Sequence, residues 1–141
     1  MTMPLKKIIC AVDFSPTSDF VVRYAAAMHG ARAELIILYV DPEANNDAAL
    51  QRKHLHEFSR YSDMLSQNDV CAAFAVQCGE PATVILDYAK KQNADMIVIG
   101  SHGSTAIARL LVGGTTETVM RNAFCPVVIL KTPTESRTAA E

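Results

Sequence analysis

The sequence predicts an α/β fold, a three-layer α/β/α sandwich on a five-stranded parallel sheet, and two observations carry this prediction. Five short apolar runs alternate with longer segments that have helical periodicity. The runs are continuous rather than alternating, as strands are when helices cover both faces of a parallel sheet. Parallel strands joined by right-handed helical crossovers place helices on both sides of the sheet.

The strands are assigned to the unbroken apolar runs. They are expected at residues 5–12, 33–40, 70–76, 95–99 and 126–130. The third run is weaker because it is rich in alanine. Pro126 opens the last run, at a position where proline costs no ladder hydrogen bond.

The helices are assigned to the segments between the runs. Ser15 can cap the first helix, and Pro16 suits its first position. Its inward positions are Val21, Tyr24, Ala25 and Met28. A second helix over 45–67 places on one face Leu50, Leu55, Phe58, Tyr61 and Leu65. A third opens at Glu80-Pro81, with Val84, Ile85, Tyr88 and Ala89 inward, and a fourth spans about 114–123 with Val119 and Met120.

Length and composition fit one domain. The chain has 141 residues, of which 50% are hydrophobic and 20% charged, so it can bury a full core. We assign residues 1–132 to a single domain and 133–141 to a polar C-terminal tail. The 13 basic and 15 acidic residues give a net charge of −2, which argues against nucleic-acid binding because such domains carry a basic excess.

The sequence also argues against a membrane partner. No stretch is long enough to span a bilayer, and the first residues lack the apolar core of a signal peptide. We therefore expect a cytoplasmic protein. The four cysteines form no CxxC pair, so buried, reduced thiols are favoured over a disulfide or a metal site.

Four of the six glycines cluster after the fourth strand. Gly100 and Gly103 follow the strand directly, and Gly113 and Gly114 open the last helix. Glycine allows tight turns and close approach to the main chain. A strand that ends in glycines and leads into a helix start is a typical phosphate site in α/β proteins.

The chemistry expected at this site depends on backbone N–H groups. Gly114 is a candidate N-cap, with Glu117 reaching back to it, and the hydroxyls of Thr115 and Thr116 can add donors. In an open α/β sheet the loop after the first strand lies beside this segment. Its Asp13 can accept from ribose hydroxyls or help to hold Mg²⁺.

Other readings of the same residues remain open. The glycines can form a simple turn, and Asp13 can serve only as a helix cap. His102 can be a surface residue, and Arg109 can either neutralise phosphate or lie in solvent. Ser101 and Ser104 have no base at a diagnostic spacing, and the Walker and dinucleotide glycine motifs are both absent.

Along nearly its whole length the chain resembles the UspA-like universal stress protein family, in its ATP-binding branch. The matching segments are residues 7–15, 33–41, 79–89, 94–103 and 109–129. The branch carries the signature G-x2-G-x9-G-[ST]. Gly100, Gly103 and Gly113 match it, but Gly114 stands where the hydroxyl residue is expected.

The resemblance implies strand order 3-2-1-4-5 and a nucleotide site. The glycines would hold the phosphates, Asp13 would lie by the ribose, and the main chain of Val40 would bind the adenine. The full set of expected nucleotide-binding residues is Ala11, Val12, Asp13, Ser15, Val40, Ile99, Gly100, His102, Gly103, Gly113, Gly114 and Thr115.

The functional prediction is a stress-response switch or adaptor that binds ATP, or AMP or ADP, with Mg²⁺ held through the phosphates and Asp13 as its one candidate protein ligand. A homodimer is expected through the last strand, Val127–Leu130, which is apolar and lies at a sheet edge. No catalytic residues are assigned. Two alternatives stay open: a dimerisation module that binds no nucleotide, and a slow ATPase or autophosphorylating enzyme.

Overall fold

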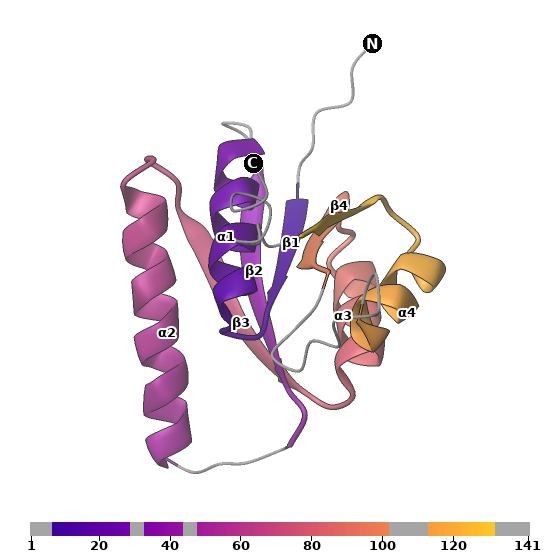
Figure 1. The fold of residues 1–141 in the computed structure, drawn as a ribbon, viewed down its shortest axis with the longest axis horizontal. Helices are drawn as coiled ribbons and strands as arrows, with labels where there is room; N and C mark the ends of the chain where they lie inside the picture. The colour runs from indigo at the N-terminus through magenta and orange to yellow at the C-terminus, as the bar shows by residue number, and fades with distance from the viewer. Residues whose placement is uncertain (1–6, 29–32, 44–47, 102–112, 132–141) are drawn as a thin grey trace, which may run out of the picture.

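The computed structural model describes residues 7–28, 33–43, 48–101 and 113–131, which form a five-stranded sheet between two helical layers (Figure 1). The strand order is β3-β2-β1-β4-β5, and every neighbouring pair is parallel. The predicted fold class and strand order are therefore confirmed. The domain boundary at residue 132 and the tail 133–141 lie outside the described residues and stay predictions.

Strands and helices alternate along the chain. The strands are β1 (Lys7–Val12), β2 (Glu34–Asp41), β3 (Ala72–Cys78), β4 (Met96–Gly100) and β5 (Val127–Leu130). The helices are α1 (Pro16–Met28), α2 (Ala48–Ser66), α3 (Pro81–Lys91) and α4 (Gly114–Asn122).

The core has two halves, one on each face of the sheet. Alternate residues of β1 show this division: Ile8 and Cys10 pack with α1 and α2, whereas Ile9 and Ala11 pack with α3 and α4. Because both faces of β1 are covered, its sequence is a continuous apolar run. This strand is the centre of the sheet.

Helices α1 and α2 are also joined by a charged contact. Arg60 of α2 donates two hydrogen bonds to the Asp19 carboxylate in the first turn of α1, at 3.0 and 2.8 Å. Arg60 also donates to Glu57 at 3.0 Å. A bidentate pair of this kind fixes the relative position of the two helices better than a single bond does.

Three apolar residues are more exposed than their helical periodicity indicated. Tyr24, Leu55 and Met120 are all exposed. Each lies on the margin of its helix's buried face, where the neighbouring layer does not reach. The helices themselves form as predicted, so the error concerns the width of the buried face.

Candidate functional site

The central strands β1 and β4 end side by side, at the point where the strand order reverses. From β1 the chain moves outward through β2 to β3, then returns to β4 on the other side of β1. Open α/β sheets bind ligands outside the carboxyl ends of the strands at such a switch point. Here Val12 and Gly100, the last residues of β1 and β4, lie at this position.

The last inward-facing residues of three neighbouring strands form the floor of the switch point. Ala11, Val40 and Ile99 are 6–7% exposed and pack on the α3/α4 side. The residues two positions earlier are fully buried: Ile9, Leu38 and Ile97. Val12, 7% exposed, faces the α1/α2 side. The floor is therefore apolar, and polar contacts must come from the loops above it.

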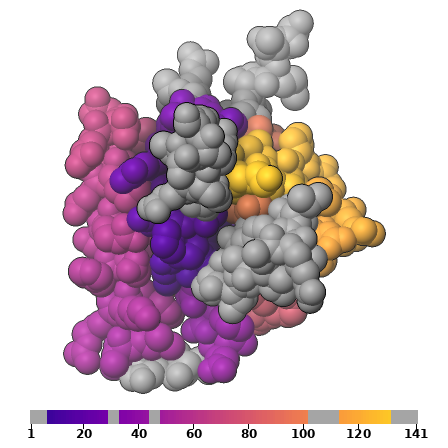
Figure 2. Space-filling model, in the orientation of Figure 1, coloured from indigo at the N-terminus to yellow at the C-terminus, as the bar shows by residue number. Residues whose placement is uncertain are grey.

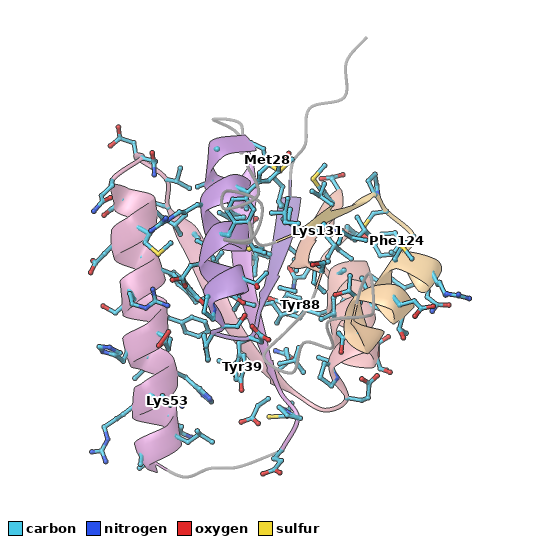
Figure 3. All side chains as sticks on the ribbon, in the orientation of Figure 1. Met28, Tyr39, Lys53, Tyr88, Phe124 and Lys131 are labelled. Carbon is cyan, nitrogen blue, oxygen red and sulfur yellow. The ribbon has the colours of Figure 1, made fainter. Side chains whose placement is uncertain are left out.

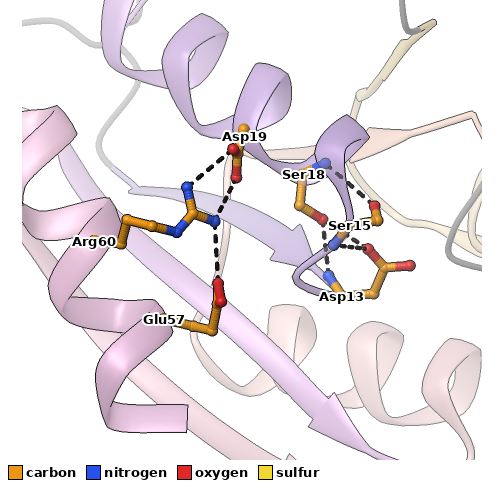
Figure 4. A network of polar contacts seen from close by, with 6 residues as sticks. All are labelled: Asp13, Ser15, Ser18, Asp19, Glu57 and Arg60. Atoms are coloured by element: carbon orange, nitrogen blue, oxygen red, sulfur yellow. Dashed lines mark hydrogen bonds and ion pairs between the residues drawn. The ribbon is translucent and has the colours of Figure 1, made fainter. Parts of the chain in front are cut away.

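The loop after β1 fixes the carboxylate of Asp13 through a compact hydrogen-bond network (Figure 4). Its Oδ1 accepts from the Ser18 hydroxyl at 2.8 Å and from the Ser15 backbone N–H at 3.0 Å. The Asp13 backbone N–H in turn donates to Ser18 Oγ at 2.9 Å. Ser18 thus bonds both the main chain and the side chain of Asp13.

The alternative role of Asp13 was that of a helix cap, but another residue occupies the capping position of α1. Ser15 is the residue placed to cap α1, with its Oγ 3.4 Å from the Ser18 N–H. Asp13 instead accepts from the capping residue and from Ser18. Its carboxylate therefore supports the start of α1 indirectly and is held in one orientation.

The other loop is anchored to the end of β4. Thr116 Oγ1 donates to the Gly100 carbonyl at 2.6 Å, and the Gly113 N–H donates to the Ser101 carbonyl at 2.6 Å. The Gly113 N–H and the Thr116 hydroxyl are thus used by the protein itself. Because its N–H is already bonded, Gly113 is a weaker candidate than predicted for donating to a phosphate. Its hydrogen bond instead connects the start of α4 to the residue after β4.

The N-cap of α4 is Gly113, so the expectation of Gly114 at this position is wrong. The predicted return of Glu117 to the cap is also wrong, because its Oε1 pairs with Arg121 at 2.9 Å. With the helix starting one residue earlier, Glu117 is beyond the third helical position and pairs along the helix instead.

The first turn of α4 differs from those of α1 and α3. Ser15 lies in capping range of α1, and Glu80 accepts from the N–H groups of Ala82 and Thr83 in α3. Within the described part of the chain, no side chain caps α4. Among the described residues, the first N–H groups of this helix, starting at Gly114, thus receive no side-chain cap, and they lie at the positive end of the helix dipole.

Gly114 is exposed and leaves open space at the start of α4. A Cβ added there would meet no atom within 4 Å. Thr115, next in the first turn, is half-buried. Of the predicted phosphate residues, the structure therefore brings together Gly100, Gly113, Gly114 and Thr115, whereas His102 and Gly103 lie outside the described residues.

The β1–β2 side of the switch point carries negative charge. Asp41 is buried at the end of β2, where its Oδ1 accepts from the Glu43 N–H at 3.0 Å. Burial, together with the charges of Asp41 and Asp13, raises the pKa of Tyr39. The site is therefore polarised, with carboxylates on one side and the positive start of α4 on the other.

Sequence reasoning assigned no site role to Ser18, and it considered Thr116 only as a phosphate donor. Ser18 lies three residues after the capping Ser15, and this spacing could have indicated a bond back to the loop. For Thr116 no local signal exists, because its acceptor is the carbonyl of Gly100, 16 residues earlier.

Two further features concern metals and membranes. In residues 7–28, 33–43, 48–101 and 113–131, no three His, Cys, Asp or Glu side chains gather closely enough to hold a metal ion. None of the helices in these segments combines the length and apolarity needed to cross a bilayer.

Comparison with known proteins supports both the fold and the family. A universal stress protein of Thermus aquaticus is 38% identical and aligns over 84% of this chain and 91% of its own. The solved structure of MJ0577, a universal stress protein of Methanocaldococcus jannaschii, has a TM-score of 0.82 at 24% identity, covering 94% of this chain and 99% of its own. UspA of Lactobacillus plantarum has a TM-score of 0.77 at 26% identity, covering 92% and 99%.

Some structural neighbours were solved with nucleotides. One universal stress protein is in complex with cAMP, one from Archaeoglobus fulgidus with dAMP, and one from Arabidopsis thaliana with AMP. Their TM-scores are 0.73, 0.72 and 0.68 at identities of 22%, 21% and 16%, so for this chain they show the fold. The family model that matches residues 4–131 is that of the universal stress proteins, and the chain belongs to this family.

Proposed function

We propose that this protein binds an adenine nucleotide at the carboxyl ends of β1 and β4 and acts as a nucleotide-dependent switch or adaptor in a stress response. ATP is the expected ligand, with AMP and ADP as the shorter alternatives. The proposal places the phosphates at the first turn of α4 and the ribose beside Asp13.

The uncapped start of α4 is the observation that carries the proposal. Its N–H groups are donors without a side-chain cap in the described residues, and Gly114 leaves space for an anion. A phosphate there would accept several N–H bonds and interact favourably with the helix dipole. The binding uses main-chain atoms, so it does not depend on a phosphate lysine.

The charge distribution favours one orientation of the nucleotide. Asp13 and Asp41 repel phosphate and can accept from hydroxyl groups, whereas the start of α4 attracts anions. The phosphates therefore belong near Gly114, the ribose near Asp13, and the base over Val40. The nucleotides bound by the structural neighbours, cAMP, dAMP and AMP, support an adenine base as the common element.

Mg²⁺ would be held mainly through the phosphates. Oδ1 of Asp13 already accepts two hydrogen bonds, so a metal at this oxygen would compete with Ser15 and Ser18. Mg²⁺ commonly keeps several waters and uses one or two carboxylates together with phosphate oxygens. Asp13 fits this pattern best as an outer, hydrogen-bonded partner.

The proposal is tested by placing a charge in the phosphate position without damaging the fold. Gly114→Asp adds a carboxylate at the first position of α4, where the helix dipole favours it and the Cβ has space. We expect calorimetric titration to show ATP and AMP affinities at least about tenfold lower in this variant. Gly114→Ala is the matched control and should bind as the wild type does.

A wild-type protein that binds none of ATP, ADP and AMP in this titration would contradict the proposal. Nucleotide released from the purified, denatured protein provides an independent check of the ligand's identity. The alternative of a module that binds no nucleotide would then be favoured. An enzyme-dependent release of phosphate, lost when the Gly114→Asp variant is used, would instead favour the slow ATPase.

The expected homodimer uses the β5 edge of the sheet. All four residues of Val127–Leu130 are only half-buried, and Met120 and Phe124 nearby are exposed. Figure 2 shows α4 and β5 on the flank of the molecule opposite α2. An uncharged edge strand of this kind favours pairing with a second copy.

Light scattering tests the dimer with a pair of edge variants. Val128→Lys on β5 should shift the protein from dimer to monomer at tens of micromolar, whereas Val76→Lys on the opposite edge strand should not. A wild-type monomer at this concentration would contradict the prediction. The cytoplasmic location stays a prediction from the sequence.

A further inference from the structure

Phe14, between Asp13 and Ser15, has an unusual backbone conformation. Its φ is 65°, in the left-handed region that glycine adopts easily and bulky residues avoid. A glycine at this position would form the same turn without strain. Because the chain has phenylalanine there, contacts of the side chain must hold the turn in place.

The aromatic ring of Phe14 supplies these contacts. It stacks on Tyr39 with ring centroids 4.3 Å apart and an interplanar angle of 25°. Phe58 lies edge-on at 5.7 Å, and the rings of His54 and Tyr61 lie at 5.8 and 6.1 Å. Figure 3 shows Tyr39 low in the sheet, at the level of the first half of α2. The ring thus ties the loop after β1 to both β2 and α2.

The turn at Phe14 determines where Asp13 points. With the chain reversed at Phe14, the Ser15 N–H reaches back to Asp13 Oδ1 at 3.0 Å, and Ser18 meets the same oxygen at 2.8 Å. The carboxylate stays at the switch point while the phenyl ring enters the α1/α2 core. One strained residue therefore separates the polar and apolar parts of this loop.

We infer that Phe14 is a positioning residue that fixes Asp13 for the hydroxyl groups of a ribose, and thereby makes the site prefer ribonucleotides over deoxyribonucleotides. This inference rests on the proposed function. A fixed acceptor rejects an analogue that lacks the matching hydroxyl much better than a mobile one does, because a mobile carboxylate can return to water. Phe14 acts on the ribose through Asp13 and makes no contact with the ligand itself.

The test compares AMP with 2′-deoxy-AMP and 3′-deoxy-AMP in calorimetric titrations. We expect the wild type to bind AMP at least about tenfold more tightly than one of the two deoxy forms. Phe14→Gly, which relaxes the backbone and removes the anchor, should bring this ratio close to about one. Its affinity for inorganic triphosphate, a probe of the α4 site alone, should change less than about twofold.

Three further variants separate positioning from general stability. Phe14→Tyr keeps the ring and should keep the wild-type ratio. Leu65→Ala weakens the same core layer without removing a ring that contacts Phe14, and should leave the ratio unchanged. Tyr39→Leu removes the stacked ring but keeps Phe14, and should lower the ratio about threefold. This variant keeps the inference testable if Phe14→Gly does not fold.

The outcomes distinguish this inference from the proposed function. The role of Phe14 is overturned if the wild type binds AMP no more tightly than both deoxy forms. It is also overturned if the preference for AMP survives in Phe14→Gly and Tyr39→Leu. Both outcomes leave nucleotide binding intact. A wild type that binds neither AMP nor inorganic triphosphate overturns both.

Discussion

Restoring a hydroxyl at residue 114 should strengthen phosphate binding without altering the fold. Gly114 is the first residue of α4, is exposed, and has no atom within 4 Å of the place that a Cβ would take. Its backbone is helical, so Gly114→Ser introduces no strain. The new hydroxyl would lie beside the uncapped N–H groups to which the phosphate is assigned.

The expected gain follows from one added hydrogen bond to a charged acceptor. Such a bond contributes about 1.5–3 kcal/mol, which corresponds to an affinity about 10- to 150-fold higher. Removing a glycine from a helix also stabilises the fold, by about 0.5 kcal/mol for serine and up to about 1 kcal/mol for alanine. Gly114→Ala therefore separates the two effects, because it has the helix gain and no hydroxyl.

The assay combines calorimetric titration with ATP and urea unfolding without ligand. Gly114→Ser should bind ATP more tightly than both the wild type and Gly114→Ala, while Gly114→Ala should be the most stable of the three. Equal affinities in all three proteins would mean that the phosphates do not reach the start of α4. Equal gains in both variants would assign the effect to helix stability rather than to the hydroxyl.

Three more predictions concern groups elsewhere in the fold. Tyr61→Phe should raise the free energy of unfolding by about 1–3 kcal/mol in urea melts, because the Tyr61 hydroxyl is buried and has no partner among the described residues. A lower free energy of unfolding in this variant would instead show that the hydroxyl makes a hydrogen bond. Backbone hydrogen bonds from Thr83 and Ala82 lower the pKa of the Glu80 carboxylate, which caps α3. Glu80→Ala should therefore lower the free energy of unfolding by about 1 kcal/mol at neutral pH. This loss should become progressively smaller as the pH falls through the lowered pKa, because the protonated wild-type side chain no longer caps the helix as a carboxylate. Thiol titration should label the exposed Cys71 and Cys78 quickly and the buried Cys10 only on unfolding, since burial raises the Cys10 pKa.

The layers of the fold could be predicted because each strand contains an unbroken apolar run. The third strand is an instructive exception, since β3 begins at Ala72 and not at Val70. Val70 belongs to the end of α2: its N–H donates to the Leu65 carbonyl at 3.1 Å, after Asp69 has turned through a φ of 56°. An apolar residue just after a left-handed cap packs against the helix it follows. The apolar pattern alone does not distinguish this position from the first residue of a strand.

The prediction that the cysteines are buried is correct for Cys10 and wrong for Cys71 and Cys78. Cys10 is buried in the central strand, but Cys71, just before the edge strand β3, and Cys78, its last residue, are exposed. An edge strand has one side with no neighbouring strand, and the sequence pattern of β3 does not show which of its residues are exposed. The exposure of these two thiols therefore required the structure.

Within the candidate site, the sequence predicted residue types better than their geometry. The glycine spacing located the start of α4 but placed its cap one residue late, because a glycine N-cap has no side chain to mark it. The left-handed turn at Phe14 had no signal at all, since a bulky residue normally argues against that conformation. The ring of Phe14 stacks on Tyr39 of β2, a contact between a loop and a strand that only the folded chain creates.

Two hydrogen bonds connect the two proposed surfaces and would give the proposed switch a physical basis. Ser101 accepts from the Gly113 N–H at the start of α4, and its own N–H donates to the Leu130 carbonyl at 2.7 Å, at the end of β5. The phosphate position and the dimer edge are thus separated by two hydrogen bonds through one buried residue. A ligand that moved the first turn of α4 would act on the Gly113–Ser101 bond, and Ser101 also makes the bond to Leu130. Nucleotide binding and dimer assembly therefore need no long pathway to influence each other, and the coupling would act in both directions.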